Sequence, residues 1–193
     1  MALTHASRKV WNRESYYLLA ESGALAPGER VELIEGEIVS VSPQNYPHAY
    51  TMGTLTNELV RLFGQTHVVR AQLPLDLGPL SQPEPDFALV TLEAHRNSRP
   101  HPTTADLVIE ISDSSLSFDR NEKTGVYAKA GLPEVWIFNL RDSQVEIYRQ
   151  PGPDSENPLG FSYMQKQTLK TGPLSPLFAP SLSLEVEKFF AEP

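Results

Sequence analysis

The spacing of apolar residues predicts several amphipathic helices. Met52, Leu55, Leu59 and Leu62 recur at helical spacing and share one face of the segment 48–63. The same criterion predicts a helix that stops before Gly23, and a short helix near the C-terminal end. Helices are therefore expected over residues 11–22, 48–63, 119–130 and 184–190.

The third of these helices has clear end signals. Asp119 is expected to be its N-cap, with Glu122 three residues later as the capping-box partner. Gly131 stands where a helix C-terminal glycine is expected. Lys123 and Tyr127 are one helical turn apart, so they share a face of this helix.

Alternating or continuously apolar runs predict the strands. They are expected at 67–73, 74–77, 86–90, 106–112, 134–140, 144–150 and 163–169, with a hairpin over 30–42 that turns at Glu35-Gly36. Residues 134–140 and 144–150 should pair as a second hairpin across 141–143. The polar segments 91–104 and 151–160 read as surface loops. Strands interleaved with helices predict an α/β fold with a mixed central sheet flanked by helices.

The length of 193 residues suits a single domain over 1–193, with a core of about 30–150 and a C-terminal extension over 160–190. The chain has no cysteine, which excludes disulfides, iron–sulfur ligation and a cysteine nucleophile. Its N-terminal residues lack the apolar segment of a secretory signal, and no apolar run reaches the roughly 20 residues of a membrane helix. A cytoplasmic protein without membrane association is expected.

Glu110 is the first residue that indicates chemistry. It lies within the apolar run Leu107-Val108-Ile109-Glu110-Ile111, which is typical of a strand covered on both faces. A carboxylate in that position costs several kcal/mol unless a raised pKa, a buried arginine or a metal ion compensates it. A structural salt bridge is the simplest interpretation of such a residue taken alone.

Asp86 changes that interpretation. It follows Pro83-Glu84-Pro85 and opens the apolar run 87–90, although taken alone it could be a solvated turn residue. Two acids on neighbouring apolar strands predict one shared site, where their mutual repulsion in a low dielectric favours a dication. A set of oxygen ligands alone favours Mg²⁺, or Mn²⁺ in its place.

Lys123 is the third candidate. Its helix follows the strand of Glu110 directly, so its first turns can fold back over the end of that strand. A lysine there could stabilise the negative charge that develops in a phosphoryl transition state. The alternative is an ordinary exposed helix lysine.

The order of these motifs resembles the PD-(D/E)XK nuclease superfamily, which has the restriction-endonuclease-like fold. The similarity is greatest to one bacterial branch, the Uma family of restriction-endonuclease-like proteins, a family of unknown function. The resemblance runs from about Trp11 to the final helix. It is carried by 32–37 (ELIEGE), 83–86 (PEPD), 108–112 (VIEIS), 131–138 (GLPEVWIF) and the series Asp119, Lys123, Tyr127 and Gly131.

The resemblance implies a restriction-endonuclease-like sheet with an N-terminal β-hairpin and extra C-terminal strands. It also implies that Asp86 and Glu110 hold a metal ion and that the inherited chemistry is hydrolysis of DNA phosphodiester bonds. The superfamily usually places its lysine two residues after the glutamate. That position is Ser112 here, on the same strand face as Glu110, and Lys123 on the next helix is the position that matches the branch.

Four further residues are candidates for the site. Glu32 could be a third metal ligand and Glu37 is the second candidate from the hairpin, although either could be a solvated charge. His48 begins a predicted helix and could be a general base, a phosphate contact or a cap. Gln72 could hydrogen-bond a ligand.

These residues predict a Mg²⁺-dependent DNA endonuclease that acts on double- or single-stranded DNA, with a homodimer expected for enzymes that cut both strands. The formal net charge of −8 is unusual for a nucleic-acid binder, so Arg120, Lys123 and Lys129 would have to supply local positive charge. The same acidity favours an alternative, a catalytically inactive nuclease fold that binds nucleic acid or regulates. Glycoside hydrolysis by paired carboxylates is a third, weaker alternative, because the chain has only two tryptophans.

Overall fold

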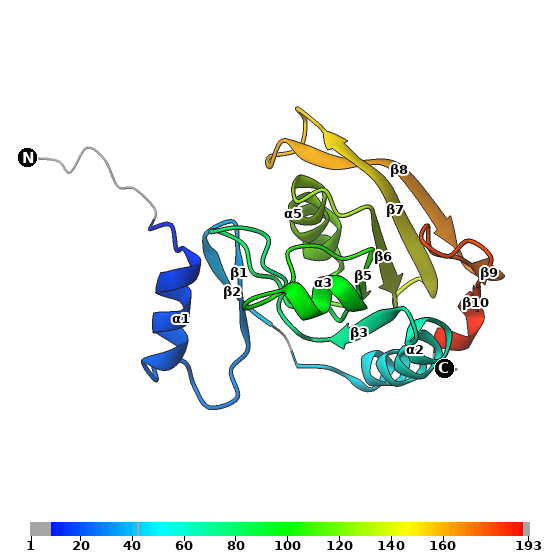
Figure 1. The fold of residues 1–193 in the computed structure, drawn as a ribbon, viewed down its shortest axis with the longest axis horizontal. Helices are drawn as coiled ribbons and strands as arrows, with labels where there is room; N and C mark the ends of the chain where they lie inside the picture. The colour runs from blue at the N-terminus through cyan, green and yellow to red at the C-terminus, as the bar shows by residue number, and fades with distance from the viewer. Residues whose placement is uncertain (1–8, 42, 191–193) are drawn as a thin grey trace, which may run out of the picture.

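The centre of the fold is a six-stranded sheet in the order β3-β4-β5-β6-β7-β8 (Figure 1). The computed structural model describes residues 9–41 and 43–190. The strands are β3 (His67–Ala71), β4 (Phe87–Thr91), β5 (Leu107–Ser112), β6 (Glu134–Asn139), β7 (Gln144–Pro153) and β8 (Phe161–Leu169). Neighbouring strands are antiparallel except β5 and β6, which are parallel. A parallel pair needs a crossover, and the helical segment between these two strands makes it.

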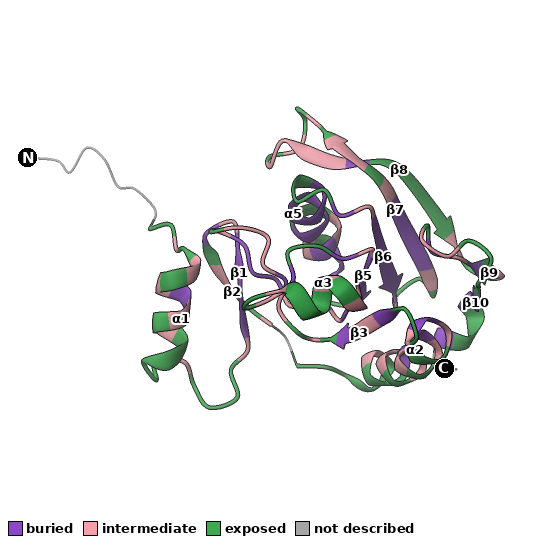
Figure 2. Cartoon of the chain, viewed as in Figure 1, coloured by how far each residue is buried: buried purple, intermediate pink, exposed green. Residues whose placement is uncertain are grey.

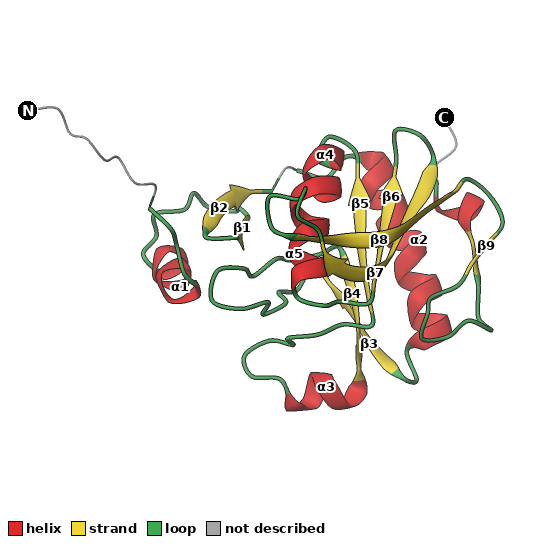
Figure 3. Cartoon of the chain, turned by 90° about the horizontal axis from the view of Figure 1, so that it is seen from above, coloured by secondary structure: helices red, strands yellow, loops and turns green. Residues whose placement is uncertain are grey.

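Helices cover both faces of this sheet, as Figure 3 shows for α2 (Tyr46–Phe63) and α5 (Thr124–Lys129). Leu55 of α2 packs in one apolar cluster with Ile109 of β5. Tyr127 of α5 packs in another cluster with Val108 of the same strand. Strand β5 is therefore buried on both faces, and the alternation of its side chains places Glu110 on the face of α5. The predicted mixed sheet flanked by helices is confirmed.

The N-terminal hairpin forms a small layer of its own with α1 (Arg13–Glu21). Its strands are β1 (Val31–Ile34) and β2 (Glu37–Ser40), joined by a turn in which Glu35 and Gly36 have φ of 48° and 81°. Two positive φ values in succession match the twist of a tight hairpin, which confirms the predicted turn. The hairpin is held to the main body where Leu33 pairs with Gln82. Figure 1 shows β1 and β2 between α1 and the central sheet.

The C-terminal end adds a second small sheet of β9 (Pro173–Leu174) and β10 (Leu184–Glu185). The helix predicted over 184–190 is wrong, because in the described part of the chain β10 is followed by a 3₁₀ turn, η2 (Val186–Phe189). Val186 and Phe189 are fully buried against the face of the sheet that α2 covers. Their apolar spacing thus reflects burial of a single turn.

Burial differs between the strands of the central sheet. Figure 2 shows that the inner strands are buried, whereas much of β8 is exposed.

The helix predicted over 119–130 begins earlier and is irregular. It consists of α4 (Leu116–Phe118), the π-helical turn η1 (Asp119–Lys123) and α5. Asp119 lies inside this segment, so its predicted role as N-cap is wrong. Its carboxylate instead accepts hydrogen bonds from Ser112 and Ser115. The end at Gly131, with φ of 73°, is confirmed.

Two further predictions are corrected. Residues 74–77 form no strand; they run as a loop whose backbone pairs with Pro83, Ser81 and Pro102 while Leu75 fills the core. The predicted loop 91–104 contains α3 (Leu92–Asn97), which Thr91 caps by accepting a hydrogen bond from the Ala94 N–H.

Within the described residues, no helix combines the length and the apolar character that crossing a bilayer requires.

Candidate active site

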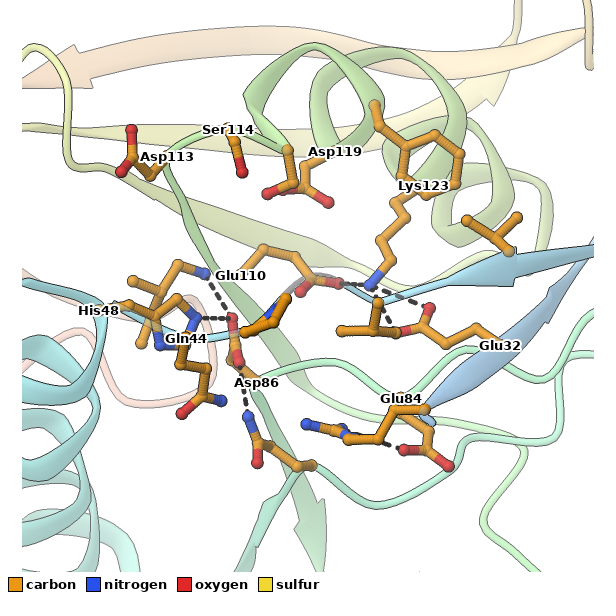
Figure 4. A pocket seen from close by; sticks show the side chains of 18 of the residues that line it. Glu32, Gln44, His48, Glu84, Asp86, Glu110, Asp113, Ser114, Asp119 and Lys123 are labelled. Atoms are coloured by element: carbon orange, nitrogen blue, oxygen red, sulfur yellow. Dashed lines mark hydrogen bonds and ion pairs between the residues drawn. The ribbon is translucent and has the colours of Figure 1, made fainter. Parts of the chain in front are cut away.

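A cavity of about 330 Å³ opens between the N-terminal hairpin, the start of α2 and the segment that follows β5. Asp86, Glu110 and Lys123 all line it, so the structure brings the three principal candidates of the sequence together. Figure 4 shows Lys123 reaching from its helix toward Glu110 and Glu32, with Asp86 beside Glu110. Strands β4 and β5 are neighbours in the sheet, which explains why Asp86 and Glu110 meet.

Asp86 is held by three groups from separate parts of the chain. The backbone N–H of Ile111 donates to Oδ2 at 2.8 Å and the amide of Gln72 donates to Oδ1 at 3.2 Å. His48 Nε2 lies 3.3 Å from Oδ2. Burial alone would raise the pKa of Asp86, but His48 and the Ile111 N–H outweigh it and hold that pKa below its usual range. Asp86 is therefore an ionised carboxylate with a fixed orientation.

Glu110 is more deeply buried, with only 3% of its surface exposed. Burial raises its pKa and the nearby Asp119 and Asp86 carboxylates raise it further, whereas the adjacent Lys123 ammonium opposes the shift and favours the ionised form. The Tyr127 hydroxyl donates to Oε1 at 2.5 Å. Lys123 Nζ lies 3.1 Å from the same oxygen. Among the described residues both contacts fall on Oε1, so Oε2 is available to a further ligand.

Lys123 is a buried cation between two glutamates. Its Nζ lies 3.0 Å from Glu32 Oε2 and 3.1 Å from Glu110 Oε1, and the side chain is 8% exposed. Burial alone would lower the pKa of Lys123, but the carboxylates of Glu110 and Glu32 raise it well above its ordinary value. Burial also raises the pKa of Glu32, although Lys123 opposes that shift. Lys123 is thus a permanent positive charge and not a proton acceptor at neutral pH.

The π-helical turn η1 carries both Asp119 and Lys123. These residues are four positions apart, a spacing that places side chains on one face of a helix. Asp119 and Lys123, the first and last residues of η1, both line the cavity. The sequence motifs missed Asp119 as a site residue, although its spacing of four from Lys123 was the available signal. Also missed were Arg30, Gln44, Asn45, Glu84, Asp113, Ser114, Ser115 and Phe118.

The remaining candidates are placed unequally. Gln72 and His48 line the cavity and contact Asp86, and Gln72 adopts a left-handed φ of 50° there. Ser112 is fully buried and donates to Asp119 at 2.7 Å, so it supports the wall of the site without facing the cavity. Glu37 is exposed on β2 and lies outside the residues that line the cavity.

The local positive charge expected from the helix is mostly used elsewhere. Arg120 is paired with Glu146 of β7, and Lys129 is paired with Glu35 at 2.5 Å. Neither side chain lines the cavity. Of the three basic residues proposed for the site, only Lys123 reaches it.

The residues of this cavity fit a divalent cation by their donor chemistry. Among the described residues, the wall carries two permanently charged bases, Arg30 and Lys123, against six carboxylates: Glu32, Glu84, Asp86, Glu110, Asp113 and Asp119. Within that same part of the chain, no three His, Asp or Glu side chains converge as a ready-made metal cluster. Mg²⁺ is commonly held by one or two carboxylates while water and substrate phosphates complete its shell. Asp86 with the free oxygen of Glu110 meets that requirement.

Comparison with known proteins agrees with the fold. A family model described as "Uma2: Putative restriction endonuclease" matches residues 13–187. No curated protein matches the sequence. Among solved structures, a "putative nuclease belonging to DUF820" from Anabaena variabilis is similar with a TM-score of 0.64 and 17% sequence identity, over 89% of this chain and 96% of that one. At this identity the likeness shows a shared fold.

Proposed function

This chain belongs to the Uma2 family of restriction-endonuclease-like proteins, and from that premise we propose that it is a Mg²⁺-dependent endonuclease that hydrolyses DNA phosphodiester bonds. One observation carries the proposal. Asp86 and Glu110, from neighbouring strands, line the same cavity as the buried ammonium of Lys123. Two carboxylates beside a fixed cation are the groups that a metal-assisted displacement at phosphorus needs.

In this proposal Asp86 and Glu110 would hold the cation. When bound, Mg²⁺ would lower the pKa of a bound water and neutralise charge on the phosphate. The protein keeps both carboxylates in place through their partners. Tyr127 orients Glu110, whereas His48 and the Ile111 N–H orient Asp86. Glu32 remains a proposed third ligand, and in the structure it is engaged with Lys123.

Lys123 would stabilise negative charge. Its ammonium lies in a buried position where solvent screens little, so its attraction for an anionic transition state is stronger than that of a surface lysine. Because its pKa is raised, it keeps its charge throughout the neutral range. Its role is therefore electrostatic, and proton transfer has to use another group.

The proposal is tested by nuclease assays on supercoiled plasmid and on single-stranded circular DNA, with Mg²⁺, Mn²⁺ or EDTA. We expect cleavage with either metal and none with EDTA. Asp86→Asn and Glu110→Gln should each lower the cleavage rate about 100-fold or more. Removing a residue that only hydrogen-bonds a metal ligand already costs up to about 100-fold, so removing the ligand itself should cost at least as much. Lys129→Ala is the matched control, because that lysine also pairs with a glutamate but outside the cavity. Full activity in the Asp86→Asn protein would reject the site.

The charge of the cavity favours a second candidate function, a catalytically inactive nuclease fold that binds nucleic acid or regulates. Lys123 is already flanked by Glu32 and Glu110, which reduces the charge it presents to a phosphate. This alternative predicts no cleavage under any metal condition and no metal-induced rise in melting temperature. Metal binding without cleavage would leave the cation site in place and reject only the nuclease reaction.

A further inference from the structure

The groups proposed to act on the substrate lie in the wall of the cavity, with little of their surface exposed to solvent. Glu110 is 3% exposed and the side chain of Asp86 is 13% exposed. The walls come from the hairpin strand β2, from residues 43–45 and from residues 113–115. A reacting phosphate has to approach such groups to about 3–3.5 Å, so the nucleotide that carries it has to enter the cavity.

The size of the cavity suits one nucleotide. Its volume of about 330 Å³ is at the lower end of the range for small-ligand pockets. A nucleotide that is stacked and paired within a duplex is hard to bring to groups as little exposed as Glu110 and Asp86. Enzymes that act on atoms held inside a duplex take single strands or nucleotides extruded from it. The geometry therefore favours a strand whose bases are unpaired.

The charge around the cavity leads to the same conclusion. Duplex binding relies on lysine and arginine that neutralise phosphates of both strands. The arginines near the cavity are matched by acids: Arg30 pairs with Glu84 at 3.2 Å and Arg141 with Asp113 at 3.4 Å. The chain as a whole carries −8. Single strands have a second source of affinity, because their bases can stack on aromatic side chains.

An exposed aromatic pair lies at the start of the helix whose N-cap, Asn45, lines the cavity. Tyr46 directly follows Asn45, which lines the cavity, and Tyr46 and Tyr50 lie one turn apart at the start of α2. Their ring centroids are 6.5 Å apart with 44° between the planes. They are 73% and 38% exposed, so packing within the fold does not explain the rings.

We propose that the substrate is a nucleic acid strand with unpaired bases, in which one nucleotide occupies the cavity and a neighbouring base stacks on Tyr46 and Tyr50. This inference rests on the proposed function, since it names the substrate class of the same site. The strand leaves the cavity past Asn45 and meets the aromatic pair on the first turn of α2. Stacking then gives a single strand binding affinity that a duplex, which depends on basic residues, does not obtain from this acidic surface.

The test is a binding measurement that needs no turnover. Fluorescence anisotropy in EDTA, and again in Ca²⁺, compares a labelled single-stranded oligonucleotide, its duplex and the duplex with an unpaired bulge. We expect the single strand and the bulged duplex to bind at least about 5-fold more tightly than the intact duplex. Tyr46→Ala and Tyr50→Ala should each weaken single-strand binding about 5-fold or more, the lower range for loss of one stacked base.

Two variants serve as controls. Tyr46→Phe keeps the ring and should bind as the wild type does, whereas Val60→Ala removes an exposed apolar side chain near the other end of α2 and should have no effect. Intact duplex binding as tight as single-strand binding would overturn the inference, and so would unchanged binding by Tyr46→Ala. Single-strand binding without cleavage would reject only the proposed reaction. A protein that binds no nucleic acid would overturn both proposals.

Discussion

At the scale of single residues, the site depends on how Lys123 is compensated. A buried ammonium is costly unless carboxylates surround it, and here Glu32 comes from β1 and Glu110 from β5. Each glutamate is itself buried and depends on the lysine for compensation. The three side chains thus form one cluster in which loss of any member exposes the others to an uncompensated environment.

Lys123→Ala should therefore destabilise the protein by about 3–5 kcal/mol, as for other broken buried ion pairs. Urea denaturation at pH 7 measures it. The matched control is Lys129→Ala, whose lysine pairs with Glu35 but is 43% exposed, so the expected cost is about 1 kcal/mol or less. Equal effects of the two substitutions would contradict the view that the buried charge of Lys123 is stabilised by its ion pairs with Glu32 and Glu110.

Glu146 gives a pH-dependent contribution away from the cavity. Burial alone would raise its pKa, but hydrogen bonds from Arg120, Asn139 and Tyr148 outweigh burial and hold that pKa below its ordinary value of 4.5. A carboxylate with a lowered folded-state pKa stabilises the fold above pH 4.5 and loses that contribution as the pH falls through the folded-state value. Glu146→Gln should thus be less stable than the wild type at pH 7, and the difference should shrink below about pH 4.5. Chemical denaturation across pH 3–7 measures this, and a constant difference would refute the assignment.

At the scale of elements, two short segments place the site residues. The hairpin β1–β2 carries Glu32 to Lys123, and its tight turn rests against the N-terminal residues. Trp11 donates its N–H to the Gly36 carbonyl at 2.8 Å. On the other side of the cavity, the π-helical turn η1 carries Asp119 and Lys123, which both line it. This turn departs from regular α-helical geometry, as segments at functional sites often do.

Gly36→Ala tests the hairpin. The position has φ of 81°, which costs an L-residue about 1–2 kcal/mol, and a Cβ there would meet Val10 and lie 3.2 Å from the Trp11 carbonyl oxygen. We expect a lower melting temperature by differential scanning fluorimetry. Gly53→Ala is the control in the opposite direction, because Gly53 is exposed within α2 with open space around it, and alanine there should stabilise by about 0.5–1 kcal/mol. A Gly36→Ala protein as stable as the wild type would contradict this account of the turn.

At the scale of the whole molecule, the cavity lies where four parts of the chain meet: the N-terminal hairpin, the start of α2, the central sheet and the segment from residue 113 to the end of η1. A ligand bound in the cavity would lie between these parts, so its binding should stabilise the folded chain as a unit. The homodimer expected from the sequence stays a prediction, which light scattering in solution would test.

Mg²⁺ at about 100 times its dissociation constant should add about 2.7 kcal/mol of stability. For a chain of this size that corresponds to a rise in melting temperature of roughly 5–11 °C. Asp86→Asn should abolish the rise, and Lys129→Ala should keep it. Calcium and manganese titrations would show whether the effect follows hard divalent cations in general. A rise that persists in Asp86→Asn would place the cation elsewhere.

The sequence by itself determined most of the fold and half of the site. The apolar run around Glu110 predicted a strand buried on both faces, because burial on two faces removes polar alternation, and the structure has β5 there. The turn at Glu35-Gly36 was predictable because it depends on local backbone preference. Asp86 and Glu110 could be predicted to meet because neighbouring apolar strands bring their polar residues to the same edge.

Only the tertiary structure decided how the charges are paired. Asp119 occupies a position that the sequence predicts as a helix N-cap. In the structure its carboxylate instead accepts hydrogen bonds from Ser112 and Ser115, and the helix begins one turn earlier. Glu32 reaches Lys123 across 91 positions of sequence, which no local pattern encodes. The physical reason is that helix and strand periods reflect interactions within a few residues, whereas the compensation of a buried charge depends on whichever side chains the packed elements bring within about 4 Å.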